Sequence, residues 1–215
     1  MPIDVPVVGA RNAAWIAAQL HLFFAAFVLG APLFIVLCEY LGAAKGAQNW
    51  RVRIPLAVAM IVLAVVIVVY AERNVDRIIV VTVAAVAVAG LAFVRSSGDA
   101  RYERLAHETM KVVTIAYSLT AISGGMFAFV LMGPYSNLAI HLFDKFSPIF
   151  AVYGLLFFVE TILLYVYWYS WDQMSNRKTL HMTIGVTLNV VGTVMMFLMN
   201  AVGAYMLTPP EGVGE

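Results

Sequence analysis

Residues 20–42, LHLFFAAFVLGAPLFIVLCEYLG, form a long apolar run with one histidine, His21, near its start. A helix needs about 17–25 predominantly apolar residues to cross a bilayer, and this run is long enough. Inside hydrocarbon, only a helix or a closed barrel satisfies every backbone N–H and C=O group. The stretch therefore predicts a membrane-spanning helix, and it raises the question of why an imidazole lies where water is scarce.

The composition of the whole chain points the same way. Of its 215 residues, 63% are hydrophobic and 12% are charged, whereas soluble domains are about a quarter charged. The net charge is +1 and no basic cluster of the kind that binds phosphates is present, so we expect no nucleic-acid partner. A single cysteine, Cys38, excludes an intrachain disulfide framework, a Cys/His zinc spacing and a c-type haem attachment motif.

Apolar runs of spanning length recur along the chain and predict an all-α integral membrane bundle of about six transmembrane helices in one domain, 1–215. The expected spans are 12–41, 54–71, 77–95, 111–133, 147–170 and 179–207. The runs at 54–71 and 77–95 are short and joined by a tight polar turn, so 54–95 is predicted to be a transmembrane hairpin. The connection 134–146 has the spacing of a short helix that lies on the membrane surface.

Lys and Arg residues set the predicted orientation, because they concentrate in cytoplasmic loops. With the N-terminus outside, the inner loops carry Lys45, Arg51, Arg53, Arg95, Arg101, Arg104, Lys111, Arg177 and Lys178, and the outer side carries Arg11, Arg73, Arg77 and Lys145. The excess on the inner side predicts that both termini lie on the outer face of the membrane.

Two ionisable residues lie well inside predicted spans. His21 is on the order of 13 Å below the outer end of its helix, and Glu160 is in the middle of the fifth span. Ionisable groups at such depths usually have a function or a specific partner. For His21 the alternatives are a hydrogen bond to a neighbouring helix or coordination of a haem iron, because neutral imidazole suits iron. For Glu160 they are an interhelical hydrogen bond, or a proton relay or haem contact.

The remaining candidates are closer to the ends of the spans. We expect Glu39 and His181 to contact lipid headgroups, and His107 to be solvated. His141, on the expected surface helix, is either solvated or reaches a cofactor near the outer leaflet. Met126 is one of several methionines that could cap a haem iron, although a methionine in a membrane helix more often serves packing.

Several stretches, in the order in which they occur, resemble a known family. They are 20–42, with His21, Gly30 and Glu39 nine positions apart, 96–129, 146–181 with FFVE at 157–160, and 203–212. Together they resemble the N-terminal four-helix part of subunit I of the cytochrome bd quinol oxidases. This resemblance implies a bacterial cytoplasmic membrane, with both termini on the periplasmic side. It implies that His21 binds a haem near the outer face. It also implies that Glu160 lies beside haems and a proton path.

The chain also departs from that family. Tyr153 stands near the place of a further family glutamate, and apolar Ala128 and Phe129 stand where another acidic residue is expected. The long quinol-binding loop and the later helices that carry other haem ligands are not found, and the hairpin at 54–95 is additional. We therefore do not expect a complete oxidase within this chain.

The sequence thus leads to one main functional expectation and two alternatives. The main one is a membrane subunit of a respiratory electron-transfer complex that binds at least one haem b, with His21 as the iron ligand. His141, Tyr153, Glu160 and Met126 are the further cofactor-binding candidates. The expected partners are other membrane subunits, the lipid bilayer, a c-type cytochrome at the outer face, and quinone. The alternatives are one subunit of a split bd-like terminal oxidase that reduces oxygen, and a haem-free structural anchor.

Overall fold

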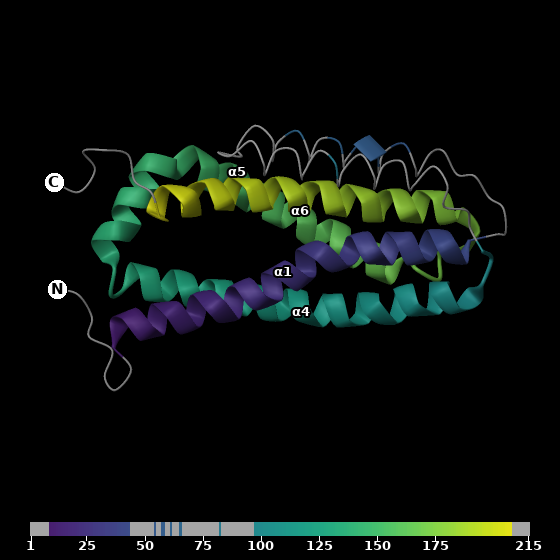
Figure 1. The fold of residues 1–215 in the computed structure, drawn as a ribbon, viewed down its shortest axis with the longest axis horizontal. Coiled ribbons are helices and arrows are strands. Elements are labelled where there is room, and N and C mark those ends of the chain that lie inside the picture. The colour runs from purple at the N-terminus through teal and green to yellow at the C-terminus, as the bar shows by residue number, and fades with distance from the viewer. Residues whose placement is uncertain are drawn as a thin grey trace. The chain divides into compact units, whose positions relative to one another are not determined.

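The computed structural model describes residues 9–43 and 97–207, together with isolated positions between them (54, 57, 58, 61, 65 and 82). The described elements are helical: α1 (Ala10–Gly42), α4 (Ala100–Met132), α5 (Ser136–Tyr169), the 3₁₀ turn η1 (Ser175–Arg177) and α6 (Lys178–Leu207) (Figure 1). The predicted hairpin at 54–95 lies outside the described residues, apart from those isolated positions.

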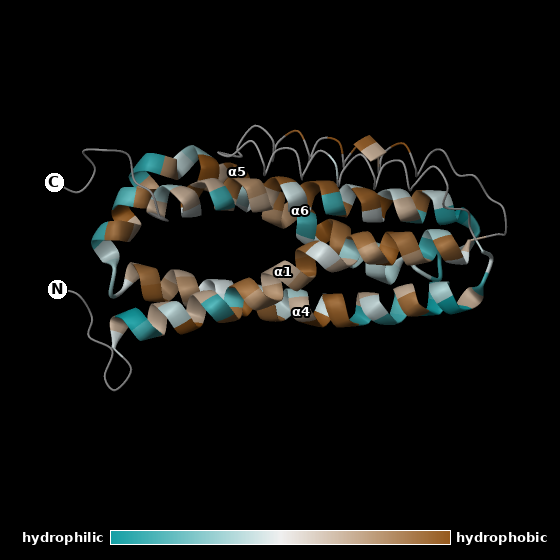
Figure 2. Ribbon diagram, viewed as in Figure 1, coloured by the Kyte–Doolittle hydropathy of each residue, from teal (hydrophilic) through white to brown (hydrophobic). Residues whose placement is uncertain are grey.

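Four of the described helices are long and apolar enough to cross a membrane. Hydrophobic residues occupy most of the length of α1, α4, α5 and α6 (Figure 2). These helices confirm the all-α class, and each of them contains, to within one residue, one of the runs predicted as spans at 12–41, 111–133, 147–170 and 179–207. The expected total of six spans stays a prediction.

Two boundaries differ from the apolar runs, and both differences have a local cause. Helix α4 begins at Ala100, well before the predicted span at 111. The polar segment that precedes the apolar run is helical as well, so the helix is longer than the run. Helix α5 begins at Ser136 and has non-helical backbone angles at Phe146 (φ −117°, ψ 17°), with Pro148 just after. Because proline clashes with the preceding turn of a helix, it promotes such a break. The break separates the predicted short helix from the predicted span at 147–170.

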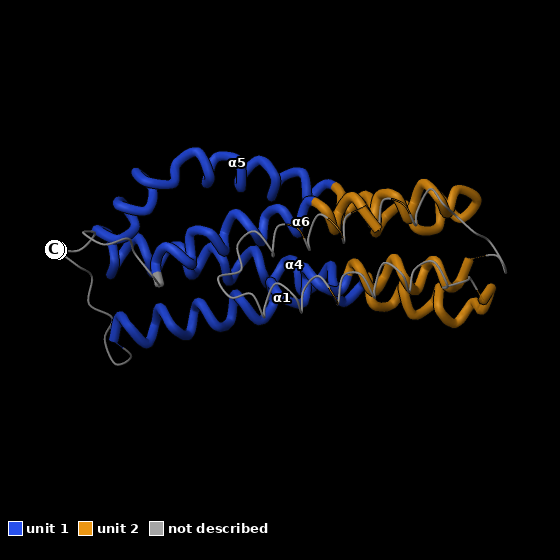
Figure 3. Tube along the Cα trace, turned by 45° about the horizontal axis from the view of Figure 1, so that its top comes forward, with its two compact units in different colours: residues 1–31, 111–162, 191–215 blue, residues 32–110, 163–190 orange. Residues whose placement is uncertain are grey.

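The chain divides into two compact units, which Figure 3 colours separately. Unit 1 comprises residues 1–31, 111–162 and 191–215, and unit 2 comprises residues 32–110 and 163–190. In unit 1, the Tyr117 hydroxyl on α4 is hydrogen-bonded to the Thr161 hydroxyl on α5. The ring of Tyr117 also stacks on Phe157 at 5.8 Å between centroids. A polar and an aromatic contact therefore join α4 to α5 in this unit.

Unit 2 contains most of the deeply buried large side chains. Those below 2% exposure among the described residues are Tyr167, Ile35, Met110, Leu164, Met182, His181, Glu39, Val36 and Val113. All of them except Val113 belong to unit 2. Two of these residues, Glu39 and His181, are an acid and a base, which sets this core apart from an ordinary apolar one.

The start of α4 is tied to the end of α1 within unit 2. Ser97 donates to the Leu41 carbonyl through both its backbone N–H and its hydroxyl, each at 2.9 Å. Gly98 has a φ of +70°, a conformation that glycine adopts without strain. Asp99 then caps α4, since its Oδ1 accepts the backbone N–H of Arg101 at 2.9 Å. The Arg101 guanidinium binds the same carboxylate, with Nη2 donating to Oδ2 at 2.8 Å.

These contacts predict a pH-dependent stabilisation. The Arg101 side-chain hydrogen bond holds the pKa of Asp99 below its ordinary value, so the ionised form is favoured in the folded chain. The stabilisation is therefore complete above the unfolded pKa of about 3.9 and is lost as the pH falls through the lower folded value. We expect Asp99→Ala to lower the melting temperature of the detergent-solubilised chain at neutral pH, and this difference to disappear in acid.

The control is Asp144→Ala, which removes an exposed carboxylate from α5. It should leave the melting temperature nearly unchanged at every pH. An Asp99→Ala effect that persists undiminished at the acid end would contradict the capping role.

Candidate functional site

In unit 1, His21 on α1 packs against α4. Its Nδ1 is 3.1 Å from the backbone carbonyl oxygen of Thr120. A Cβ atom added to Gly124 would lie 2.9 Å from Cε1 of the imidazole, so the ring rests directly on this glycine. A Cβ atom at the adjacent Gly125 would meet nothing within 4 Å. Gly124 therefore seats the ring, whereas the exposed Gly125 contacts no described group.

This hydrogen bond determines which nitrogen of His21 is available. Because a carbonyl oxygen can only accept, Nδ1 must carry the hydrogen. In a neutral imidazole, Nε2 then has a free lone pair, and it has no hydrogen-bond partner among the described residues. A backbone carbonyl that fixes one ring nitrogen and leaves the other free is the usual arrangement around a metal-binding histidine. The chemistry of this side chain therefore fits an axial ligand.

Glu160 is the buried carboxyl group of unit 1, with 6% of its surface exposed. It lies against α6, where a Cβ atom added to Gly192 would be 2.9 Å from Oε1 and 3.0 Å from Leu29 Cδ2. No hydrogen bond or ion pair to Glu160 is found within the described part of the chain. Burying a carboxyl group without a polar partner is costly, so this group is a candidate for proton or ligand binding.

No described contact joins His21 to the other expected cofactor residues. Met126 is 49% exposed on α4. His141 is exposed, and its Nε2 is 3.1 Å from the Tyr205 hydroxyl. Tyr153 is half-buried on α5, seven residues before Glu160 and thus near the same helix face. Their roles at a cofactor stay predictions.

In unit 2 the structure brings Glu39, Tyr167 and His181 together. His181 Nδ1 is 2.7 Å from Glu39 Oε1, and the Tyr167 hydroxyl donates to Glu39 Oε2 at 2.8 Å. The other ring nitrogen of His181, Nε2, is 2.8 Å from the backbone carbonyl oxygen of Tyr167. The His181 and Tyr167 rings also stack at 4.4 Å between centroids. We call these residues the Glu39 cluster.

This arrangement corrects several expectations. Headgroup contacts for Glu39 and His181 are wrong, because the two side chains are 1% and 0% exposed and bind each other. Tyr167 was not expected to take part. A signal was nonetheless available, since Glu39 and His181 lie at the inner ends of the first and last predicted spans, where a carboxylate and an imidazole at similar depth can pair. His107 is half-buried, stacks on Trp171 and lies tilted against Trp168, each at 5.0 Å between ring centroids, so it is not simply solvated.

Trp171 covers the Glu39 cluster toward the end of unit 2. Its ring meets His181 edge-on at 4.7 Å, and the Lys178 ammonium lies 5.7 Å from the Trp171 ring centroid. Lys178 also forms an ion pair with Glu103. The cluster is thus separated from this partly exposed ion pair by one aromatic ring.

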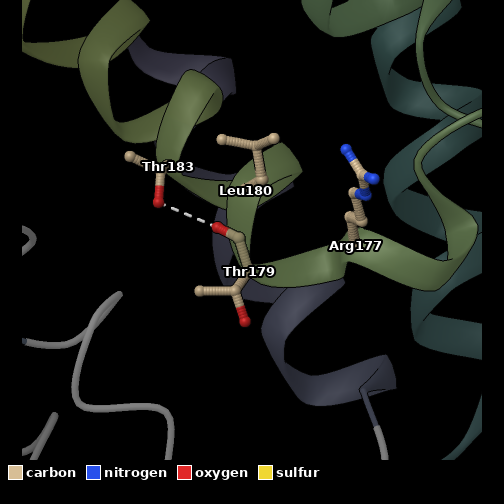
Figure 4. Close-up of a pocket in the computed structure, with 4 residues that line it drawn as sticks. All are labelled: Arg177, Thr179, Leu180 and Thr183. Carbon is tan, nitrogen blue, oxygen red and sulfur yellow. Dashed lines mark hydrogen bonds between the residues drawn. The ribbon is translucent and has the colours of Figure 1, made fainter.

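A surface cavity of about 380 Å³ at the start of α6 is lined by Arg177, Thr179, Leu180 and Thr183. Figure 4 shows the Arg177 and Thr179 side chains pointing in different directions. The Thr183 hydroxyl donates to the Thr179 carbonyl within the helix at 2.8 Å. These polar groups do not converge on one point, so the cavity supports no binding site.

The described residues contain no group of three or more His, Cys, Asp or Glu side chains that would hold a bare metal ion. A haem needs fewer protein ligands than a bare metal ion, because the porphyrin itself supplies four nitrogen ligands to the iron. The helices and their buried ionisable side chains define a multi-pass α-helical membrane protein.

Within that class, the chain belongs to the cytochrome bd terminal oxidase subunit I family, which it matches over residues 77–214. It is therefore a membrane subunit related to respiratory oxidases. The matched range includes α4, α5 and α6, with Glu160 and His181, and begins after α1, so His21 and Glu39 precede it. No curated protein and no solved structure matches the chain.

The tight seat of Tyr167 predicts a stability difference between two glycine variants of α6. A Cβ atom added to Gly185 would be 2.8 Å from Tyr167 Cζ and 2.6 Å from Val36 Cγ2. Gly185→Ala should therefore destabilise the chain by about 1–3 kcal/mol through overpacking, measured by thermal unfolding in detergent.

Gly203→Ala on the same helix is the matched control, because its added Cβ atom would meet nothing within 4 Å. It should be neutral or stabilising by up to about 1 kcal/mol, as alanine favours helix over glycine. Equal stability of the two variants would refute the close packing of Tyr167.

Proposed function

We propose that this chain is a haem b-binding membrane subunit of a respiratory electron-transfer complex, with His21 as an axial ligand of the iron. The observation that carries the proposal is the hydrogen bond from Nδ1 to the Thr120 carbonyl, which leaves Nε2 free in a half-buried position. Membership of an oxidase subunit family supports a haem as the group that His21 would hold.

The surroundings of His21 suit a flat aromatic macrocycle. Gly124, which the ring touches, has no side chain, and small residues let a planar ligand approach a helix closely. Bound haem would supply one-electron transfer. The Thr120 carbonyl keeps the imidazole in the correct tautomer and increases its basicity toward iron. The Gly124 seat limits the rotation of the ring, so Nε2 keeps one direction.

The predicted topology adds a direction to this proposal. With both termini on the outer side, His21 lies in the outer half of the membrane. A haem there would exchange electrons with a partner at the outer face, for which a c-type cytochrome is the expected class. Other membrane subunits would cover the apolar surface of the helices, which includes Phe23 at 72% and Phe129 at 80% exposure.

A spectroscopic experiment tests the haem ligand. In the native complex purified with its partners, His21→Ala should abolish the Soret absorption that belongs to this haem. Gly124→Ala displaces the imidazole and should weaken haem retention by about 10–100-fold, the usual cost of disturbing the support of a metal ligand. Haem content per chain is measured by the pyridine haemochrome assay.

Gly125→Ala is the matched control, since its added Cβ atom contacts no described group, so it should keep the iron ligand intact. A wild-type haem content in His21→Ala would overturn the assignment. A native complex without any Soret band would instead favour the haem-free anchor.

A second candidate function, one subunit of a split bd-like terminal oxidase, is favoured by Glu160. Its buried carboxyl group without a described polar partner is suited to pass protons toward a reacting centre. If this function holds, the native complex consumes oxygen, and Glu160→Gln lowers that rate by about 10²–10⁴-fold, the usual contribution of a proton-transfer group.

Haem content should stay unchanged in Glu160→Gln, which separates a proton role from a loss of cofactor. Electron transfer without any oxygen consumption in the wild-type complex would rule out the oxidase and leave the electron-carrier function standing.

A further inference from the structure

The three hydrogen bonds of the Glu39 cluster determine how many protons the cluster must hold. Each of its contacts needs one hydrogen. The Tyr167 hydroxyl supplies the hydrogen for Glu39 Oε2, and His181 Nε2–H supplies the one for the Tyr167 carbonyl, which can only accept. The remaining contact joins His181 Nδ1 to Glu39 Oε1 at 2.7 Å. A neutral imidazole has already used its single N–H, so this contact requires a further proton.

That proton has two possible positions with the same total charge. On Nδ1 it gives an imidazolium beside a carboxylate, and on Oε1 it gives a neutral acid beside a neutral imidazole. Both forms are electrically neutral overall, which reconciles the pair with its exposure of 0–1%. Without the proton, two lone pairs would face each other at 2.7 Å, and a net negative charge would remain buried.

The hydrogen bonds described for the pair join it to Tyr167 and to no other charged side chain. Titratable groups close to the cluster include Cys38 and Tyr40, which adjoin Glu39 on α1, His107 and Glu103 on α4, and Lys178 on α6. Lys178 and Glu103 neutralise each other in their ion pair, and Trp171 separates Lys178 from His181. The described ring contact of His107 is with Trp171, whereas the described hydrogen bonds of the Glu39 carboxylate are with Tyr167 and His181.

We infer that Glu39 and His181 together form a proton-binding site within unit 2, which holds one proton between Oε1 and Nδ1. Tyr167 is the positioning residue. Its hydroxyl donates to Oε2 of Glu39, and its carbonyl accepts from Nε2 of His181, so Oε1 and Nδ1 are left facing each other. The site is independent of the haem proposed at His21.

A proton held only by the folded chain makes the stability of the fold decrease as the pH rises. In the unfolded chain the glutamate is ionised above about pH 4.3 and the histidine is neutral above about pH 6.5, so the pair holds no proton there. The folded pair keeps one. Unfolding above about pH 6.5 therefore releases a proton, and the unfolding equilibrium constant rises about tenfold per pH unit until the folded pair itself deprotonates.

The decisive variant is Glu39→Gln in the full-length chain in detergent. The amide N–H₂ can donate to Nδ1 and the amide oxygen can accept from Tyr167, so every hydrogen bond persists without the additional proton. We expect the wild type to lose stability as the pH rises above about 6.5 and Glu39→Gln to lose this dependence. A neutral His181 beside an ionised Glu39, a pair that holds no additional proton, would show no such difference.

Tyr167→Phe is the companion variant, because it removes one hydrogen bond and keeps the proton. It should unfold more easily at every pH and retain the wild-type slope. Should Glu39→Gln not fold, the double variant Glu39→Gln/His181→Gln, in which neither position titrates, takes its place. A wild type with a flat profile above about pH 6.5, or a Glu39→Gln variant with the wild-type slope, would overturn the inference.

Discussion

The scarcity of water inside a bundle of membrane helices is the constraint on which this structure depends. A polar group there must find its partner within the chain, in a bound ligand or in a neighbouring subunit, because lipid offers none. The chain meets this constraint through contacts between helices. In unit 1 the Tyr117 and Thr161 hydroxyls pair, and in unit 2 Glu39 joins α1 to α5 and α6.

The two units satisfy their ionisable groups in different ways. In unit 2 every hydrogen-bonding atom of the Glu39 and His181 side chains has a partner, and the cluster lies in a densely buried core. In unit 1, His21 has one ring nitrogen engaged and one free, and Glu160 has no polar partner among the described residues. A satisfied cluster needs nothing further except its proton. Groups with unused bonding capacity are the ones that a haem or a proton path would use.

Much of the fold could be predicted from hydropathy, and the errors have a common origin. The span at 12–41 and the break before 147 follow from local properties, namely an apolar run and a proline after a polar connection. For Glu39 and His181, depth in the predicted spans suggested contact with lipid headgroups, and Tyr167 was not singled out. The true partners of Glu39 are distant in the sequence, because Tyr167 is 128 residues away and His181 is 142 residues away.

The sequence by itself determined that this is a helical membrane protein, that it resembles the cytochrome bd oxidase subunit I family, and that His21 and Glu160 lie within spans. These properties are local, since they depend on run length, composition and motif order. Only the tertiary structure decided which nitrogen of His21 is free, and that Glu39, Tyr167 and His181 meet. The physical reason is that the hydropathy of a span does not specify which side chains of two helices meet. Close packing does specify it, as at Gly124, which His21 contacts, and at Gly185, which Tyr167 contacts.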